Sequence, residues 1–312
     1  MRGKDPTNKN RRNRKWLRIF GITFLLLLVG VGIYAFSIYK SISGAVETMH
    51  QPIDREKSEK REEQVTLEKK DPFSILMMGV DEREGDKGRS DTIIVLTVNP
   101  NLKSVKMLSI PRDTRTEIIG HGTVDKINHA YAFGGVEMSM DTVEHFLDIP
   151  IDYYMQINME GFKEIVDAVG GVTVYNDLAF NDAGFSFPKG DITLSGEKAL
   201  VFSRMRYDDT RGDFGRQQRQ RQIIQGVIKE GASLSTLTNY GPIFEALGDN
   251  IRTNLTFKEM VDIQKNYKEA SKSIEQIGIN GDGTKIDSIY YFIVPDEEKI
   301  NIQNKLKQHL EI

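Results

Sequence analysis

The sequence predicts an α/β fold, in which a central mixed β-sheet is flanked by helices within a single domain at residues 71–312. Three observations lead to this prediction: an uncharged apolar stretch of helix length near the N-terminus, three β-rich runs separated by short turns after residue 71, and amphipathic helical segments that alternate with further strands. With 312 residues and 39% hydrophobic side chains, the chain can bury a substantial core.

The N-terminal region predicts a membrane anchor. Residues 19–39 read IFGITFLLLLVGVGIYAFSIY without a charge, close to the roughly 20 residues that a helix needs to cross a bilayer core. A cleaved signal peptide is the alternative, but it would require a small-residue cleavage site, which FSIYK at 36–40 lacks. Residues 1–18 carry eight basic side chains against one acid, so this tail is expected to stay in the cytoplasm and the domain to lie outside the cell membrane.

Composition limits the classes of partner. Once the eight basic residues and one acid of the tail are set aside from totals of 42 and 45, 34 basic side chains remain against 44 acidic ones. An acidic exported part argues against general nucleic-acid binding. The absence of cysteine excludes disulfides and thiolate chemistry, and suits a cell envelope that does not rely on oxidative folding, such as a Gram-positive surface.

The segment between the predicted span and the domain, residues 40–70, is dominated by charge and shows little apolar periodicity. Its centre reads EKSEKREEQ. We interpret this segment as a spacer. The folded domain is then expected to begin at residue 71, because a continuous apolar run of strand length, FSILMMGV at 73–80, follows almost directly.

Two further strands are predicted directly after the strand that opens the domain. DTIIVLTV at 91–98 and SVKMLSI at 104–110 are β-rich runs joined by a loop of hairpin length. If neighbouring strands are antiparallel, the end of the first, the start of the second and the end of the third lie on one rim of the sheet. Asp81, Asp91 and Arg112 occupy those three places and are expected to lie close together.

The remainder of the domain alternates between helix and strand patterns. Helices are predicted where apolar residues recur every three or four positions and where glycine or proline marks an end. Short runs rich in β-branched and aromatic residues separate these helices. The predicted helices are residues 134–147, 161–171, a short one from Ser195, 216–232 and two between Phe257 and Leu310, and the predicted strands are 151–158, 172–176 and 288–294.

Arginine is concentrated in one stretch, RMRYDDTRGDFGRQQRQRQ. Arg204 and Arg206 are two apart, so in extended backbone they project to the same side. Arg216, Arg219 and Gln220 stand at i, i+3 and i+4 and share one face of a helix near its N-terminus. Guanidinium groups keep their charge and present paired donors, and a helix N-terminus adds further donors, so the pattern predicts a phosphorylated ligand.

Two alternatives remain for these charged residues. The arginines would be ordinary surface charges if they pair only with Asp208, Asp209 and Asp213. Asp81 and Asp91 favour a ligand site instead, because Mg²⁺ typically takes one or two protein carboxylates together with waters and phosphate oxygens. The alternative for this pair is an acidic loop without a metal, since loops after strands contain many aspartates.

Several other kinds of site lack their residues. The chain has no Gly-x-Ser-x-Gly, no His-Glu-x-x-His and no cysteine pair, which argues against a serine hydrolase, a zinc protease and a redox enzyme. GINGDGTK at 278–285 has the order Gly-Thr-Lys where a phosphate-binding loop has Gly-Lys-Ser/Thr, and is interpreted as a turn. His129 is a candidate acid or base, although a single histidine is more often structural.

Several segments, in order along the chain, resemble the motifs of the LytR-CpsA-Psr family. They are DER and RSDT on the rim loop, then SIPRDT, KINHAYAFGG, INMEGFKEIVDAVGGVTV, and RMR followed by GDFGRQQRQ. Together they cover most of residues 71–232, and any one of them alone would be unspecific. The resemblance is closest to teichoic-acid-transferring members from Gram-positive bacilli, and it implies the α/β/α fold of that family.

The resemblance implies that the domain transfers an anionic glycopolymer of the wall teichoic acid type from undecaprenyl pyrophosphate to a peptidoglycan hydroxyl, usually C6 of N-acetylmuramic acid. It implies Mg²⁺, or alternatively Mn²⁺, bound by Asp81 and Asp91, and an apolar pocket for the prenyl chain beside the sheet. The implied pyrophosphate contacts are Arg89, Arg112, Arg204, Arg206, Arg216 and Gln220, with Arg83 and Arg219 matching less specifically.

The implied mechanism follows the physics of phosphoryl transfer: the arginines and the cation neutralise charge while a sugar hydroxyl attacks in line. Asp91 and Asp213 are the candidate bases, and Asp91 is the poorer one if it binds the metal, because a cation lowers the pKa of a carboxylate. Two other functions fit the same residues. One is a sensor or regulator that binds prenyl-pyrophosphate lipids without turnover, and the other is a pyrophosphatase in which water replaces the sugar.

Overall fold

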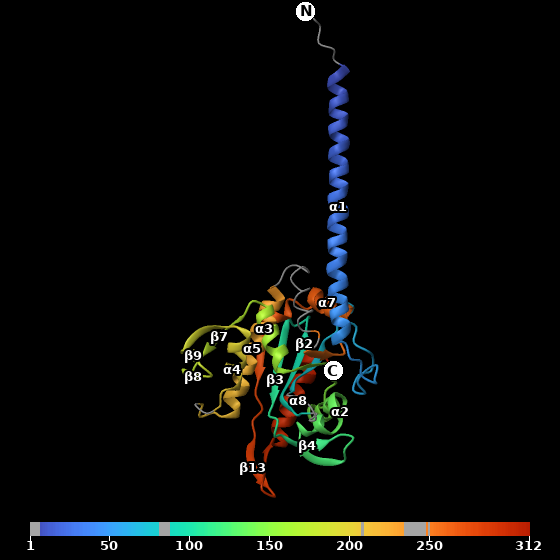
Figure 1. The fold of residues 1–312 in the computed structure, drawn as a ribbon. Coiled ribbons are helices and arrows are strands. Elements are labelled where there is room, and N and C mark those ends of the chain that lie inside the picture. Colours follow the sequence, from blue (N-terminus) through green and yellow to red (C-terminus); the bar gives the residue numbers. More distant parts are fainter. Residues whose placement is uncertain (1–6, 81–87, 207–208, 234–247, 249) are drawn as a thin grey trace, which may run out of the picture.

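The centre of the domain is a six-stranded mixed sheet with strand order β11-β6-β1-β2-β3-β12 (Figure 1). The computed structural model describes residues 7–80, 88–206, 209–233, 248 and 250–312. β1, β2 and β3 form the predicted antiparallel meander, whereas β6 joins β1 and β12 joins β3 in parallel pairs, which confirms the mixed sheet. The strands are β1 (Phe73–Val80), β2 (Ser90–Asn99), β3 (Ser104–Ile110), β6 (Tyr153–Ile157), β11 (Ile251–Thr253) and β12 (Ile274–Ile277).

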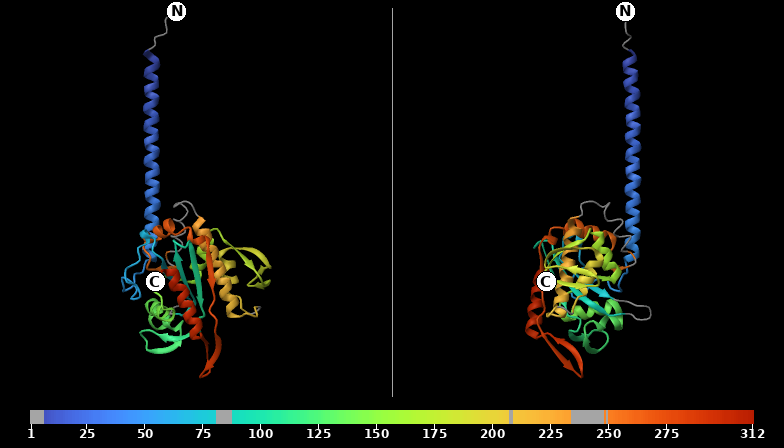
Figure 2. Two further views of the ribbon diagram at one scale, coloured as in Figure 1. Left: turned by 180° about the vertical axis from the view of Figure 1, so that it is seen from behind. Right: turned by 60° about the vertical axis from the view of Figure 1, so that its left-hand side comes forward.

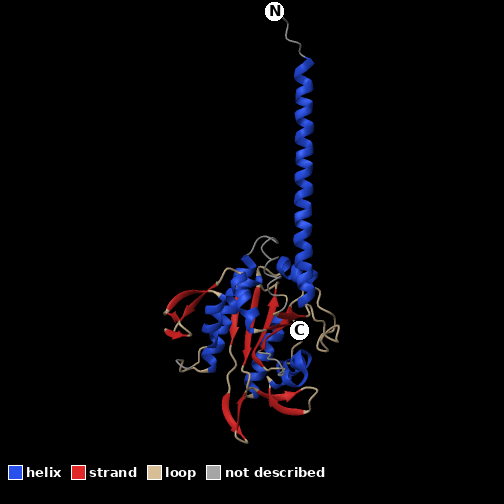
Figure 3. Ribbon diagram, viewed as in Figure 1, coloured by secondary structure: helices blue, strands red, loops and turns tan. Residues whose placement is uncertain are grey.

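Helices cover both faces of this sheet (Figure 3). β1 alternates between the two layers: Leu76 and Met78 pack into one hydrophobic cluster, and Phe73 and Met77 into the other. The first cluster includes side chains of α2 and α8, and the second includes side chains of α5 and α7. The predicted buried strand is therefore confirmed, since both of its faces lie inside. These helices are α2 (His129–Leu147), α5 (Asp213–Ser233), α7 (Phe257–Asn266) and α8 (Asp296–Leu310).

A smaller unit packs against the outer side of α5. It has its own aromatic core, in which Phe180, Phe187 and Phe202 all contact one another with centroid distances of 4.6, 5.6 and 5.7 Å. β7 and β10 form an antiparallel pair next to α3 and α4. Its elements are α3 (Met159–Ala168), β7 (Val172–Asn176), β8 (Phe180–Asp182), β9 (Phe185–Phe187), β10 (Gly190–Leu194) and α4 (Gly196–Arg204).

Two hairpins lie at the end of the domain opposite α1 (Figure 2). The first joins β4 (Arg115–Ile118) to β5 (Thr123–Lys126), and the second joins β13 (Asp282–Ile286) to β14 (Ile289–Ile293). The second hairpin shows that the prediction of a turn at 278–285 is wrong from Asp282 onwards. The glycine-rich segment is extended because it pairs with the aromatic strand β14, so tertiary pairing outweighs local propensity.

The chain enters the domain from a long helix, α1 (Thr7–Met49), which projects away from it (Figure 1). Within the part of the chain that the structure describes, no helix combines the length and the apolarity that crossing a membrane requires. The span at 19–39 therefore stays a prediction. At the other end of α1, Met49 is buried beside Ile251, and the backbone N–H of Gln51 donates to Thr253 O at 2.8 Å.

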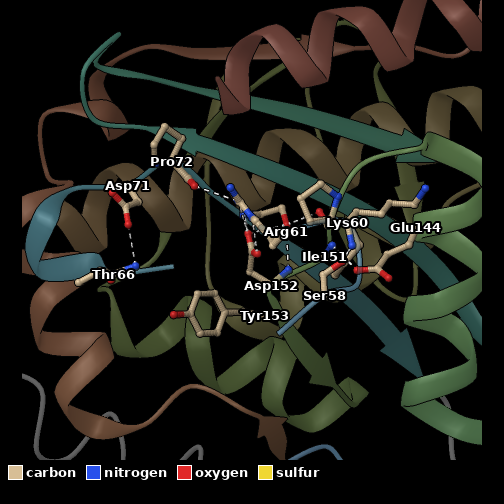
Figure 4. Close-up of polar contacts among 12 residues, drawn as sticks. Ser58, Lys60, Arg61, Thr66, Asp71, Pro72, Glu144, Ile151, Asp152 and Tyr153 are labelled. Carbon is tan, nitrogen blue, oxygen red and sulfur yellow. Dashed lines mark hydrogen bonds and ion pairs between the residues drawn. The ribbon is translucent and has the colours of Figure 1, made fainter. Parts of the chain in front are cut away.

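Residues 50–70 lie against the domain, which differs from the predicted spacer (Figure 4). Arg61 is 10% exposed and donates from Nη2 to Asp152 Oδ2 at 2.7 Å and to Pro72 O at 3.0 Å. Arg55 donates to both carboxylate oxygens of Glu144, at 3.0 and 3.1 Å. In the sequence, these closely spaced charges resembled a solvated linker. In the structure, Arg55 and Arg61 pair with acidic side chains that are distant in the chain, and these ion pairs attach α1 to the sheet.

The buried pair of Arg61 and Asp152 is expected to matter more than an exposed pair. Arg61→Ala should lower the free energy of unfolding by about 3 kcal/mol, because it leaves Asp152 buried with one charge partner removed. The matched control is Lys258→Ala, which breaks an exposed pair with Glu68 and should change stability by less than about 1 kcal/mol. Urea denaturation of the purified variants measures both values, and equal effects would contradict this assignment.

A buried histidine makes the fold sensitive to acid. His309 of α8 lies between Thr97 and Ser104, with Nδ1 at 2.8 Å from Thr97 Oγ1 and Nε2 at 2.9 Å from Ser104 Oγ. Burial lowers the pKa of His309 from 6.5 to about 4. The unfolded chain therefore binds more protons than the folded chain between these two pH values.

The free energy of unfolding should consequently fall by about 3 kcal/mol as the pH decreases from 6.5 to 4, with the full contribution present above pH 6.5. Denaturation at a series of pH values measures this decrease. In His309→Gln, which cannot titrate, the decrease should be smaller by about that amount. If the free energy of unfolding of His309→Gln decreases with falling pH as much as that of the wild type, His309 is excluded as the cause.

Candidate functional site

One half of the site lies on the predicted rim of the sheet. Arg112, just after β3, donates from Nη1 to Asp91 Oδ1 at 2.8 Å, at the start of β2. Partial burial lowers the pKa of Arg112 and the charge of Asp91 raises it, with a net increase. The meander thus brings Asp91 and Arg112 together as predicted. Arg89 is exposed just before β2, and Asp81 and Arg83 lie outside the described residues.

The other half lies at the N-terminus of α5. Asp213 is the first residue of this helix, and Arg216, one turn later, contacts it with 2.6 Å between Nη2 and Oδ1. Arg206 approaches the same carboxylate oxygen at 3.8 Å. Arg216 is 6% exposed, and burial lowers the pKa of its guanidinium. Its Nε is buried and has no hydrogen-bond partner among the described residues, as is also the case for the Nε of Arg219.

The two halves meet between the sheet and α5. The pKa of Arg216 responds to the charges of Asp213, Arg206, Arg112 and Asp91, and that of Arg112 responds in turn to Asp213. Residues from distant parts of the chain therefore share one electrostatic environment. A small polar pocket, which we call the arginine pocket, lies here beside Arg112 and is lined in part by Asp91, Ser109, Arg112, Gln217 and Gln220.

Two residues of this pocket were not predicted. Ser109 Oγ is buried and lacks a hydrogen-bond partner within the described part of the chain. Gln217 is buried on α5 and donates from Nε2 to Asp213 Oδ2 at 2.9 Å, so it orients a carboxylate of the site. Gln217 lies one turn after Asp213. This i, i+4 spacing is visible in the sequence, and on a helix it indicates that the two side chains are neighbours.

Arg204 and Arg219 do not share these contacts. Arg204 is exposed at the end of α4, and its Nη1 lies 3.5 Å from the sulfur of Met159. Arg219 is buried, and its terminal nitrogens donate to Asp209 Oδ2 and Met205 O, each at 2.6 Å. The helical spacing that grouped Arg219 with Arg216 does not give the two residues the same contacts, and the assignment of Arg219 as a pyrophosphate contact stays a prediction.

Asp209 connects the arginine-rich stretch to α5. Hydrogen bonds from Arg211 and from Arg219 hold the pKa of this carboxyl well below its usual range. A side chain on Gly215 could not coexist with this arrangement, because its Cβ would lie 1.9 Å from Asp209 Oδ2. Part of the arginine-rich stretch is thus structural, as the alternative of charge pairing predicted, while Arg206 and Arg216 face the site.

His129 has an acidic partner, so it is not an isolated histidine. Its Nδ1 lies 2.7 Å from Asp125 Oδ2, and Asp125 Oδ1 accepts a hydrogen bond from Tyr291 at 3.2 Å. This arrangement orients the imidazole at the N-terminus of α2, directly after Asn128, whose N–H donates to Arg112 O at 3.3 Å. A structural role in supporting the backbone at Arg112 accounts for these contacts.

The donor chemistry of the rim suits a hard cation. Among the described residues there is no cluster of three or more His, Cys, Asp or Glu side chains that would hold a transition metal. Mg²⁺ does not need such a cluster, since one or two carboxylates with waters and phosphate oxygens suffice. Asp91 supplies one half-exposed carboxylate that points towards Arg112. The pairing of Asp81 and Asp91 around Mg²⁺ or Mn²⁺ stays a prediction.

A second, larger cavity of about 420 Å³ lies beneath residues 52–65. It is lined mainly by polar and charged side chains, including Arg55, Asp152 and Glu259, and it is remote from the arginine pocket. Its lining does not match the apolar pocket expected for a prenyl chain, so that pocket also stays a prediction.

Comparison with known proteins identifies the family. A profile of the LytR_cpsA_psr family matches residues 36–308, nearly the whole domain together with the end of α1. This chain belongs to the LytR_cpsA_psr family. The resemblance of the motifs is therefore confirmed, and the arginine pocket is a site within a LytR_cpsA_psr domain.

Curated relatives of this family member match it over almost their full length. The polyisoprenyl-teichoic acid–peptidoglycan teichoic acid transferase TagU of Bacillus subtilis strain 168 is 51% identical over 305 residues, which cover 97% of this chain and 99% of the relative. The protein of the same name from Bacillus cereus strain AH820 is 56% identical over 288 residues, covering 92% and 95%.

Solved structures of this family share the fold. The crystal structure of Bacillus subtilis TagU has a TM-score of 0.64 at 51% identity and covers 78% of this chain and 98% of that one. The structure of TagT bound to LIIa-WTA has a TM-score of 0.73 at 33% identity and covers 84% and 100%.

The different surroundings of two arginines lead to different expected effects of mutation. Arg219→Ala should lower the free energy of unfolding by about 3 kcal/mol, because it removes a buried partner of Asp209. Arg206→Ala should change stability by less than about 1 kcal/mol, because its contact with Asp213 is long and partly exposed. Urea denaturation measures both. A large loss in Arg206→Ala together with none in Arg219→Ala would reverse the assignment.

Proposed function

We propose that this protein transfers a glycopolymer of the wall teichoic acid type from a polyprenyl pyrophosphate to a hydroxyl of peptidoglycan, and so forms a phosphodiester in cell wall biogenesis. The observation that carries the proposal is the meeting of Arg112 from the sheet rim with the buried Arg216 of α5 beside Asp91 and Asp213. The names of the Bacillus relatives and the WTA ligand of TagT support the same substrate class.

The pocket suits a pyrophosphate more than a neutral ligand. Arg112, Arg206 and Arg216 bring three guanidinium groups together, and in the absence of a ligand they contact the carboxylates of Asp91, Asp113 and Asp213. Guanidinium forks bind phosphate oxygens in pairs, and the N-terminus of α5 adds a favourable dipole.

The transfer step requires charge stabilisation and one proton acceptor. The acceptor hydroxyl attacks the phosphorus that carries the polymer, the bond from this phosphorus to the bridging oxygen breaks, and prenyl phosphate leaves with the electron pair. Arg112 and Arg216 stabilise the charge that develops on the phosphate oxygens. Asp213 is our candidate to accept the hydroxyl proton, since Gln217 and Arg216 fix its orientation.

A divalent cation completes the proposal. Asp91, together with Asp81 outside the described residues, would hold Mg²⁺ or Mn²⁺. When bound, the cation would supply further positive charge to the phosphate oxygens of the donor. With Asp91 committed to the cation, Asp213 becomes the better of the two candidate bases, because a cation lowers the pKa of its ligand.

We further propose that residues 19–39 anchor the protein in the cell membrane with the domain outside. Exposed apolar side chains on the described part of α1 support this proposal, among them Phe24, Leu26 and Ile33. Eight basic residues precede the segment, which favours a cytoplasmic N-terminus. The anchor would keep the site near a donor whose prenyl chain lies in the same membrane.

Replacement of Arg112 provides the direct test of the site. Arg112→Ala should reduce polymer transfer by about 100-fold or more, because it removes one preorganised charge from the transition state. Its stability should stay within about 1 kcal/mol of the wild type. Transfer is measured as formation of a phosphodiester between a lipid-linked donor and a peptidoglycan oligosaccharide. Arg252→Ala, on β11 at the α1 end of the domain, is the matched control and should keep full activity.

The same assay separates the alternative functions. Tight donor binding without any phosphodiester in the wild type would indicate a sensor or regulator. Release of phosphate that does not depend on the acceptor would indicate a pyrophosphatase. Full transfer by Arg112→Ala would remove this residue from the mechanism.

A further inference from the structure

An exposed aromatic surface continues from the site onto the β13–β14 hairpin. Phe214 follows Asp213 at the N-terminus of α5, is 50% exposed, and meets the ring of Phe292 edge-on with centroids 5.8 Å apart. Tyr290 lies two residues before Phe292 on β14, so both project from the same face of the hairpin. Tyr290 is 46% exposed. We call the two exposed rings of Phe214 and Tyr290, together with the buried ring of Phe292 (3% exposed) that contacts Phe214, the aromatic shelf.

A glycine places the outer ring of the aromatic shelf against the hairpin. Gly283 pairs with Phe292 across the hairpin, diagonal to Tyr290. A Cβ on Gly283 would lie 2.6 Å from Tyr290 Oη and 2.8 Å from its ring. The ring therefore packs directly on the backbone of β13, which only glycine permits, and its remaining surface faces solvent. The exposed ring is thus supported by a contact specific to this backbone.

The hairpin is attached to the residues of the site. The backbone N–H of Phe292 donates to Asp113 O at 2.9 Å, and Asp113 is the neighbour of Arg112. Phe214 connects the same ring to α5 beside Asp213. A chain lying along the aromatic shelf would therefore start next to both charged halves of the site and extend outward along β14.

We propose that the aromatic shelf binds the acceptor glycan strand and positions its hydroxyl next to Asp213, an inference that rests on the proposed transferase function. Sugar rings have apolar C–H faces that pack on aromatic rings, while their hydroxyl groups stay hydrated. Ile286 and Ile289 at the hairpin tip are also exposed and extend this apolar surface. A contiguous exposed apolar surface beside a polar site is more often a binding region than isolated exposed apolar residues are.

Charge and location favour the acceptor over the polymer carried by the donor. The hairpin has two acids, Asp282 and Asp287, against one base, Lys285, and the basic side chains beside it, Arg115 and Lys126, lie over Tyr291 rather than Tyr290, so the aromatic shelf offers little attraction to a polyanionic polymer. The hairpin also lies at the end of the domain opposite α1 (Figures 1 and 2). A wall polymer reaches that end directly, whereas a lipid-linked donor comes from the side of α1.

The test varies the acceptor concentration in the transfer reaction of the full-length protein, with a peptidoglycan oligosaccharide of N-acetylglucosamine and N-acetylmuramic acid as probe. Phe214→Ala and Tyr290→Ala should each raise the KM for the oligosaccharide about tenfold and leave the KM for the donor within about twofold. Tyr290→Phe keeps the ring, so its KM for the oligosaccharide should be lower than that of Tyr290→Ala. The matched control is Tyr175→Ala, which removes a 54% exposed tyrosine on β7, outside the aromatic shelf.

Unchanged acceptor KM in both alanine variants would overturn the proposal, and so would a rise in donor KM of equal size, which would place the donor polymer on the aromatic shelf. Thermal unfolding confirms that each variant is folded. A separate measurement follows binding of the oligosaccharide to the protein without donor, by chemical-shift changes or calorimetry. If the wild type binds the oligosaccharide through Phe214 and Tyr290 but transfers no polymer, the proposed transferase function is wrong and the acceptor site on the aromatic shelf is supported. If the wild type transfers polymer but the alanine variants bind the oligosaccharide normally, the acceptor site on the aromatic shelf is wrong.

Discussion

The site depends on the buried ion pair between Arg219 and Asp209, because this pair sets how the N-terminus of α5 meets the sheet. Burying two charges is costly unless geometry and hydrogen bonding are nearly complete. Asp209 meets this condition with Arg211 and Arg219, and Arg219 also reaches the carbonyl of Met205. The absence of a side chain at Gly215 makes the close approach possible. With this turn of α5 immobilised, Arg216 is directed towards the sheet rim.

The carboxylates of the site have a second consequence. The guanidinium groups of Arg112, Arg206 and Arg216 would repel one another, yet Asp91 and Asp113 contact Arg112, and Asp213 contacts both Arg206 and Arg216. A pyrophosphate can replace these carboxylates as the partner of the guanidinium groups, which would free them for the proposed roles of metal ligand and base. The ion pairs therefore keep the pocket preorganised at modest cost, which is the condition for electrostatic stabilisation of a transition state.

The sequence predicted those features that depend on local pattern. β1, β7 and the meander were located because apolar runs of strand length have clear ends, and the meander alone was enough to place Asp91 beside Arg112. Features that depend on distant partners were missed or assigned wrongly. The charged residues around Arg61 resembled a linker, since nothing nearby in the chain reveals Asp152 as their partner. Arg219 and Arg216 look equivalent on a helix, and only packing shows that one of them faces inward.

The same distinction explains the β13–β14 hairpin. Its glycines favour turns locally, but Gly283 is the residue on which Tyr290 rests, so the feature that suggested a turn is the one that builds the exposed aromatic surface. The site then lies between two approaches. α1 and residues 50–70 attach the domain at one end, and the hairpin extends from the other (Figure 1). In the proposed transfer a lipid-linked polymer is joined to peptidoglycan, and a pocket at the sheet rim, between α1 and the hairpin, would let the two proposed substrates approach from different sides.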